Sequence, residues 1–320
     1  MQSLAMPADS AISDVASDRP AVDLRRLRRI FDRRAARFAE AAFLPREIAQ
    51  RMHERLEYIK VAPERVIDVG CGRGDDLGAL RARYPQASMC GLDLSAGMLG
   101  VASAGVDAAG SPWRRLLPRA LRERGSALVQ GDYAHLPFAG DSFDLLWSNL
   151  ALQWHAQPDR VFPEWQRVLK VGGLLMFSTL GPDTLRELRT GADETATLSF
   201  VDMHDFGDML VASGFETPVM DAETLTVTYG SPETLLRDVR RWGGEPRVGL
   251  GPRGLAGRDR QRDRIAALEA QRRADGTIPL TFEVIYGHAW KARTRTTPEG
   301  HGVIRLDEIG RGGSHRRPPR

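Results

Sequence analysis

Cysteine, metal-ligand clusters and long apolar runs are scarce or absent in this chain of 320 residues. Its two cysteines, Cys71 and Cys90, do not form a Cys-x-x-Cys pair, and no histidines and cysteines occur at metal-ligand spacing. We therefore expect no bound metal, and we interpret both cysteines as small core residues of a protein in the reducing cytoplasm. No uninterrupted apolar stretch reaches the ~18 residues that a membrane-spanning helix requires, so we expect no membrane span.

The N-terminal region also lacks the features of a targeting segment. Residues 1–21 contain three aspartates and no apolar block, which argues against a secretory signal and against an acid-poor transit peptide. We expect residues 1–23 to form a disordered extension, residues 24–291 to form one folded domain, and residues 292–320 to form a flexible basic tail. The net charge is only +3, and the tail has no aromatic residues among its arginines, so we expect no specific nucleic-acid site.

An apolar run followed by a glycine-rich turn occupies residues 66–74, Val-Ile-Asp-Val-Gly-Cys-Gly-Arg-Gly. It predicts a buried strand that turns into a helix, which is the nucleotide-binding corner of a doubly wound sheet. The candidate ligand-binding residues in this turn are Asp68, Gly70, Gly72 and Gly74. A second apolar run, residues 89–94, ends in Asp93-Leu94, where the Asp93 carboxylate can accept both hydroxyls of a ribose.

The charge at the predicted helix start distinguishes between nucleotides. A dinucleotide site seats a pyrophosphate on the helix N–H groups, and Asp75 and Asp76, which complement the helix dipole, would repel it. S-adenosylmethionine (SAM) carries no phosphate but a sulfonium, an ammonium and one carboxylate. Asp68 favours its cationic end, and the N–H groups of the glycine turn can meet its carboxylate. We therefore predict SAM as cofactor and S-adenosylhomocysteine as product; the alternative is a glycine turn that only packs helix on strand.

Strands and helices continue to alternate along the chain. Further strands are expected at residues 127–130, 145–150, 174–178, 224–229 and 282–290, and a helix is expected at about residues 158–169. The pattern predicts an α/β fold, a doubly wound and mostly parallel seven-stranded sheet closed by an antiparallel hairpin. Helices at residues 231–242 and 258–273 would form a cap over the substrate side. Asp132, after the third strand, can accept the adenine amino group, and Tyr133 could flank the adenine ring.

Several motifs together resemble the class I SAM-dependent methyltransferases, whose fold is Rossmann-like. They are Asp68-x-Gly-x-Gly-x-Gly74, Gly131-Asp-Tyr-x-x-Leu-Pro-Phe138, Asp141-Ser-Phe-Asp144, Ser148-Asn-Leu-Ala-Leu-Gln-Trp154 and Leu169-Lys-Val-Gly-Gly173. Within that superfamily, Ser148–Trp154, Phe177–Leu180 and Ile278–Thr281 most resemble the malonyl-acyl-carrier-protein O-methyltransferases of biotin synthesis. The resemblance implies SAM contacts at Leu94 and Asn149 as well, and an acyl carrier protein as partner.

A second family is similar in other segments. Phe31-Asp-Arg33, Gly181–Leu188 and Val227-Thr-Tyr229 resemble the methyltransferase-like assembly factors of respiratory complex I, of which one is described as a protein arginine hydroxylase. In addition, the biotin-pathway proteins carry a tyrosine where this chain has Phe38, so a hydroxyl that could contact the malonyl carboxylate is missing. The methyl acceptor is thus open between a malonyl thioester, a complex I protein and a small metabolite.

The acceptor chemistry suggests a small set of substrate residues. A malonyl carboxylate is ionised at neutral pH, so it needs orientation rather than a general base, and we assign no catalytic base. We expect Gln153, Trp154 and His155, which follow the fourth strand, to orient the acceptor, together with Phe38. Arginines crowd residues 25–37, a predicted amphipathic helix that would lid the pocket and steer an acidic partner towards it.

Overall fold

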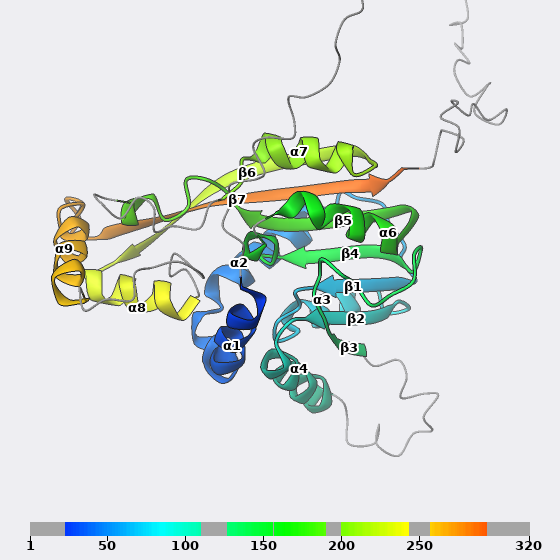
Figure 1. Cartoon of the computed structure of the whole chain (residues 1–320), viewed down its shortest axis with the longest axis horizontal. Coiled ribbons are helices and arrows are strands. Elements are labelled where there is room, and N and C mark those ends of the chain that lie inside the picture. Colours follow the sequence, from blue (N-terminus) through cyan, green and yellow to red (C-terminus); the bar gives the residue numbers. More distant parts are fainter. Residues whose placement is uncertain (1–22, 110–126, 156, 190–199, 243–256, 293–320) are drawn as a thin grey trace, which may run out of the picture.

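A seven-stranded sheet with the order β3-β2-β1-β4-β5-β7-β6 runs through the molecule (Figure 1). Its strands are β1 (Arg65–Val69), β2 (Ser88–Asp93), β3 (Ala127–Gln130), β4 (Phe143–Asn149), β5 (Leu169–Leu180), β6 (Phe215–Tyr229) and β7 (Ile278–Lys291). The first five strands pair in parallel, and β7 pairs antiparallel with both β5 and β6. This architecture confirms the predicted mostly parallel sheet with a closing antiparallel hairpin.

The computed structural model describes residues 23–109, 127–155, 157–189, 200–242 and 257–292. The helices are α1 (Leu24–Arg34), α2 (Phe43–Leu56), α3 (Asp75–Arg83), α4 (Ala96–Ala109), α6 (Phe162–Val168), α7 (Met203–Ala212), α8 (Pro232–Trp242) and α9 (Gly257–Glu269). Short 3-10 segments occur at η1 (Ala35–Ala41), η3 (Leu152–Trp154), η4 (Pro158–Arg160) and η5 (Arg186–Leu188). The expected N-terminal extension and basic tail lie almost wholly outside the described residues and stay predictions.

Helices cover both faces of the sheet, as the alternation of strands and helices predicts. On one face, Ile48 of α2 and Leu80 of α3 belong to the same buried cluster as Trp147 of β4. On the other face, Trp165 of α6 and Phe206 of α7 belong to a second buried cluster. Strands β1, β2, β4 and β5 are therefore mostly buried on both faces, whereas the edge strand β3 is not, and a ligand can reach these strands at their carboxyl ends.

The β6–β7 hairpin is longer than the sequence predicts. It extends beyond the parallel strands, and α8 and α9 lie at its far end (Figure 1). Along β6 the side chains are only half-buried or exposed except at the two ends. Such an edge strand has a weak apolar alternation, and this is why the pattern detects only its final residues.

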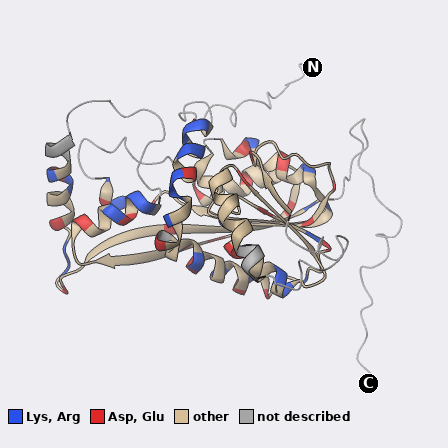
Figure 2. Ribbon diagram, turned by 90° about the horizontal axis from the view of Figure 1, so that it is seen from below, with Lys and Arg blue, Asp and Glu red and all other residues tan. Residues whose placement is uncertain are grey.

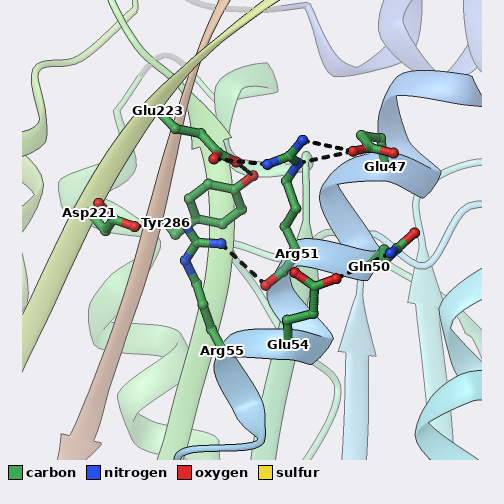
Figure 3. A network of polar contacts seen from close by, with 8 residues as sticks. All are labelled: Glu47, Gln50, Arg51, Glu54, Arg55, Asp221, Glu223 and Tyr286. Atoms are coloured by element: carbon green, nitrogen blue, oxygen red, sulfur yellow. Dashed lines mark hydrogen bonds and ion pairs between the residues drawn. The ribbon is translucent and has the colours of Figure 1, made fainter.

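Charged side chains join α2 to this hairpin (Figure 3). The guanidinium of Arg51 lies 3.1 Å from the Glu223 carboxylate, and that of Arg55 lies 2.6 Å from the Asp221 carboxylate. Arg55 also lies over the ring of Tyr286, 3.8 Å from its centre, and the Tyr286 hydroxyl donates to Glu223. These contacts fix α2, whose first turn contributes to the functional site, on β6 and β7.

Two predicted helices differ from the observed ones. The N-terminal α-helix ends at Arg34, and Phe38 lies in the 3-10 segment η1 that follows. The single helix expected after residue 158 is divided, because Pro163 lies at the start of α6 and its ring cannot continue a helix from the preceding turn. The C-terminal cap helices form close to their predicted positions.

Candidate active site

A pocket lies at the carboxyl ends of β1, β2 and β4, where open parallel sheets place their ligands. The chain leaves β1 towards β2 on one side, and β4 pairs with β1 on the other, so the pocket lies at the switch point of the sheet. The lining residues are Leu24, Leu27, Phe31, Phe38, Pro45, Arg46, Asp68, Gly70, Cys71, Gly72, Arg73, Asp75, Asp76, Asp93, Leu94, Met98, Asp132, Tyr133, Asn149, Leu150, Ala151, Gln153 and Trp154. The segment α1–η1 forms the wall opposite the sheet.

The structure brings most of the expected site residues together in this pocket. The lining includes eight of the nine expected cofactor residues, namely Asp68, Gly70, Gly72, Asp93, Leu94, Asp132, Tyr133 and Asn149. It also includes three of the four expected acceptor residues, Phe38, Gln153 and Trp154. Gly74 and His155 are outside the lining.

The three glycines of the turn have different structural roles. Gly70 has a φ of 77°, and a Cβ at this position would lie 2.4 Å from the Cβ of Ala151, so only glycine allows β1 and β4 to end this close together. Gly72 has a φ of 53°, and a Cβ there would meet nothing within 4 Å. A Cβ at Gly74 would touch Ala102 and Leu77 instead, so this glycine packs α3 against α4 rather than facing a ligand.

Asp93 connects β2 to the glycine turn. Its Oδ2 accepts from the Gly72 N–H at 2.8 Å, and its Oδ1 accepts from the Ser95 N–H at 2.8 Å. Burial raises the pKa of Asp93 to about 6, against the lowering effect of these two hydrogen bonds. Each carboxylate oxygen keeps a further lone pair, so Asp93 can still accept ribose hydroxyls.

Asp68 and Asp76 lie on the sheet side of the pocket. Asp68 is 2% exposed, and its Oδ2 has no partner. The Oδ2 of Asp76 accepts from the Trp147 indole at 3.0 Å and from the Asn149 amide at 3.1 Å. Asn149 also bonds to Pro45 O and to Ser178, so its amide is engaged within the protein on both sides.

The end of β4 has an unusual backbone. Leu150, which is not a glycine, has a φ of 50°, in the sparsely populated left-handed region. Its N–H is held by both the carbonyl and the hydroxyl oxygen of Ser178, at 3.2 and 3.0 Å. This turn places Ala151 against Gly70, and the Ala151 carbonyl accepts from the Tyr133 hydroxyl at 3.2 Å. Backbone strain of this kind is concentrated at ligand-binding sites in proteins. The sequence around Leu150 does not indicate it.

Three aromatic side chains, Phe31, Phe38 and Trp154, form one wall of the pocket. Phe31 of α1 packs edge-on against Trp154 with ring centres 5.3 Å apart, and Phe38 lies 6.4 Å from Phe31. The Gln153 amide nitrogen donates to Leu150 O at 2.6 Å, while its Oε1 is buried without a partner. His155 is outside the lining; its ring accepts from the Gln157 N–H and lies 5.9 Å from the ring of Tyr133.

Two arginines in the lining were not expected from the sequence. The pocket wall contains Arg46 at the start of α2 and Arg73 within the glycine turn, alongside five aspartates. Arg73 has two buried nitrogens, Nε and Nη1, without a partner. Unpaired buried polar atoms are rare in native proteins. In this pocket, unpaired buried polar atoms occur on three side chains, those of Asp68, Arg73 and Gln153. Their presence in one pocket indicates a site for a ligand that has both positive and negative groups.

Comparisons with known proteins agree with this geometry. Residues 67–177 match the model of a methyltransferase domain. The malonyl-acyl-carrier-protein O-methyltransferase of Nitrosospira multiformis is 44% identical over 295 residues, which cover 89% of this chain and 96% of that protein. That of Laribacter hongkongensis is 47% identical over 277 residues, covering 85% of this chain and 91% of that protein. This chain belongs to the malonyl-acyl-carrier-protein O-methyltransferase family.

Solved structures support the fold of this methyltransferase independently. The YcgJ protein of Bacillus subtilis superposes with a TM-score of 0.54 at 20% identity, over 76% of this chain and 98% of that chain. A putative methyltransferase of Bacillus halodurans gives a TM-score of 0.54 at 18% identity, over 77% and 99%. The chain is a class I SAM-dependent methyltransferase, and the predicted resemblance to this superfamily and to its biotin-pathway family is confirmed.

In the described part of the methyltransferase, no helix is both long and apolar enough to cross a membrane. Within the same ranges, no group of three or more His, Cys, Asp or Glu side chains is arranged to hold a metal ion.

Proposed function

We propose that this enzyme transfers a methyl group from SAM to the free carboxylate of malonyl-acyl carrier protein. Two observations carry the proposal. The pocket contains buried acids together with Arg73, two of whose buried nitrogens have no partner, and the relatives are 44–47% identical over most of the chain. A cation, a carboxylate and an adenosine all find suitable partners in this pocket. SAM, when bound, supplies a methyl group already activated by the sulfonium.

The residues around the glycine turn would hold SAM. Asp93 would accept the ribose hydroxyls, and Asp132 and Tyr133 would meet the adenine. The N–H groups next to Gly72 would receive the methionine carboxylate, and Asp68 would face the cationic end. Asn149 would act through its bonds to Asp76 and Ser178, which position these groups, rather than through the ligand itself.

The acceptor would enter from the aromatic side. The malonyl carboxylate is an ionised nucleophile, so the enzyme needs to orient it and exclude water. Gln153 adjoins Trp154 in the chain, and Arg46 follows Phe38 at the start of α2. Both line the pocket, and we assign them this orientation. The missing hydroxyl at Phe38 is compatible with this assignment, because two arginines of the lining can take its place as partners of a carboxylate.

An acidic carrier protein would dock on the arginine surface, which we define as the exposed Arg25, Arg26, Arg28, Arg29, Arg33 and Arg37. The ribbon in Figure 2 shows basic residues, coloured blue, concentrated on α1, with further ones on α8. The single acid within residues 25–37, Asp32, has its Oδ1 engaged with Ser95 and Gly97, and its Oδ2 lies 3.6 Å from Arg28, so it compensates the charge of one arginine of this surface in part. A basic rim beside the pocket would raise the association rate with an acidic partner.

Methyl transfer from labelled SAM tests the proposal directly. The substrates to compare are malonyl-carrier protein, acetyl-carrier protein and the unacylated carrier, at equal concentrations. We expect label only with the malonyl form, because only it presents a free carboxylate. Equal labelling of the acetyl form, or no labelling of any form in an enzyme that binds SAM, would contradict the proposed acceptor.

A further inference from the structure

Asp68 and Asp76, which we call the carboxylate pair, come from different elements but lie on the same face of the sheet. Asp68 of β1 pairs in register with Trp147 of β4, so their side chains share one face. The Trp147 indole donates to Asp76, in the first turn of α3, which brings Asp76 to that face as well. Both carboxylates line the pocket.

The hydrogen-bond partners of the carboxylate pair include no cationic side chain. Asp68 is almost fully buried, and its Oδ2 has no hydrogen-bond partner. The partners of Asp76 Oδ2, Trp147 and Asn149, are both neutral. The remaining charged groups of the lining are three more carboxylates, Asp75, Asp93 and Asp132, and two guanidiniums, Arg46 and Arg73.

The electrostatic consequences follow from this arrangement. Burial, and then repulsion from Asp76, raise the pKa of Asp68 well above its usual value. Burial raises the pKa of Asp76 to about 6, opposed by the hydrogen bonds from Trp147 and Asn149. His53 stacks on Trp147 at 4.6 Å, but burial and then Arg83 lower its pKa, so it does not supply a cation near neutral pH.

We propose that Asp76 completes, with Asp68, a receptor for the positively charged end of SAM, and that the pair takes up one proton when that charge leaves. This inference rests on the proposed function, since it takes SAM as the ligand. The balance is simple: a protonated carboxyl group and a ligand cation give a carboxylate–cation pair and one released proton. Affinity for SAM therefore rises with pH up to about 7 and falls by at most tenfold per unit below about 6.

Proton release can be measured without any methyl acceptor. Titration calorimetry at pH 6 in buffers of different ionisation enthalpy gives the number of protons released on binding. Four probes separate the two cations of SAM: SAM itself, S-adenosylhomocysteine (ammonium only), 5′-dimethylsulfonio-5′-deoxyadenosine (sulfonium only) and 5′-methylthioadenosine (neither). The last probe contains the ribose, so it also reports any proton released from Asp93.

Each outcome is decisive. Release that exceeds the methylthioadenosine value with SAM and S-adenosylhomocysteine assigns the pair to the ammonium; an excess with SAM and the sulfonium probe assigns it to the sulfonium. We expect an excess of roughly half a proton at pH 6, where a carboxyl group with a pKa of about 6 is half-protonated, and much less at pH 8. No excess for any cationic probe would overturn the inference while leaving methyl transfer to malonyl-carrier protein intact, so the two proposals fail separately.

Variants test the residues themselves. Asp76→Asn keeps an acceptor for Trp147 and Asn149 but removes the charge, and we expect less than half of the excess release and at least tenfold weaker SAM binding at pH 8. Asp205→Asn, the same change in the first turn of α7, is the matched control and should alter neither quantity. Trp147→Phe removes a donor that favours the ionised form, so the midpoint of proton release should move to higher pH. An unchanged midpoint and unchanged release in both pocket variants would contradict the role of Asp76.

Discussion

The carboxylate of Asp32 on α1 accepts a hydrogen bond from the Ser95 hydroxyl at 2.6 Å, and its Oδ1 also accepts from the Gly97 N–H at 2.9 Å. Ser95 in turn donates its N–H to Asp93. A Cβ on Gly97 would lie 3.0 Å from the Asp32 backbone, so the close approach of α1 and α4 depends on this glycine. Helix α1 is thereby connected through one serine to the carboxylate that we assign to the ribose.

Asp32→Ala should loosen the lid. Burial acts to raise the pKa of Asp32, but hydrogen bonds from Ser95 and Gly97 lower it overall, which shows that they favour the charged form. Loss of these hydrogen bonds should reduce the free energy that holds α1 against α4 by roughly 1–2 kcal/mol. We expect faster amide exchange in α1 in the presence of S-adenosylhomocysteine and about tenfold weaker binding, with Asp32→Asn retaining most of both. Unchanged exchange in the alanine variant would show that α1 is held by its apolar contacts alone.

Asp93→Ala should weaken adenosine binding whatever the charge of the ligand. The change removes both the ribose acceptor and the anchor of the Gly72 N–H. Calorimetry should show at least a tenfold loss for SAM and a similar factor for 5′-methylthioadenosine, because both contain the ribose. A loss confined to SAM would mean that Asp93 acts through its charge, and an unchanged affinity for both would refute the assignment.

Arg73→Gln should weaken the binding of a carboxylate that pairs with the cation in the glycine turn. Two buried nitrogens of Arg73 lack partners, and a carboxylate in the pocket would provide them. If the methionine carboxylate is that partner, the Kd of S-adenosylhomocysteine rises by roughly 10–100-fold; if the malonyl carboxylate is, the KM for the acceptor rises instead. Arg73→Lys should recover part of the loss. If neither constant moves, Arg73 has only a packing role.

Reversal of charge on the arginine surface should affect the protein acceptor selectively. For Arg25→Glu with Arg29→Glu, we expect the KM for malonyl-carrier protein to rise about tenfold at low salt, and the effect to shrink at high salt. The KM for malonyl-pantetheine should not change. Lys60→Glu with Arg65→Glu, at the amino end of β1, is the control with equal charge change. An equal effect of both pairs would point to general charge rather than to docking.

The carboxylate pair should make the unliganded enzyme sensitive to pH. A carboxyl group whose pKa is raised on folding contributes stability that is complete below its unfolded value near 3.8 and is lost as pH rises through its folded value, about 6 for Asp76. Asp76→Asn should therefore leave the Tm nearly unchanged at pH 4 and raise it by a few degrees at pH 7.5. Thermal unfolding without ligand measures this, and a lower Tm of the variant at pH 7.5 would contradict it.

The sequence predicts the corner of this fold better than its edges. Local sequence patterns predict the positions of the glycine turn, Asp93 and Asp132, since a buried strand followed by glycines has few alternative structures. The boundaries of β6 and of α6 do not, because one depends on ion pairs between Asp221, Glu223 and α2, and the other on the position of Pro163.

The site residues that sequence reasoning missed are those whose roles arise only in three dimensions. From the sequence, Asp76 could equally stabilise the start of a helix or bind a ligand. Only its hydrogen bonds with Trp147 and Asn149 show that its side chain turns into the pocket. Arg73 is one arginine among many, and its lack of partners is a property of packing. His155 illustrates the reverse case, because it follows the signature motif but lies beyond the end of η3.

The position of the transferred methyl group tests the central claim most directly. The enzyme is incubated with malonyl-carrier protein and SAM that carries a trideuterated methyl group, and the thioester is then cleaved and its acyl group analysed by mass spectrometry. We expect the label to be recovered as the monomethyl ester of malonic acid, with none on the polypeptide of the carrier. Label on the carrier polypeptide, or unmodified malonate from an enzyme that binds SAM, would contradict it.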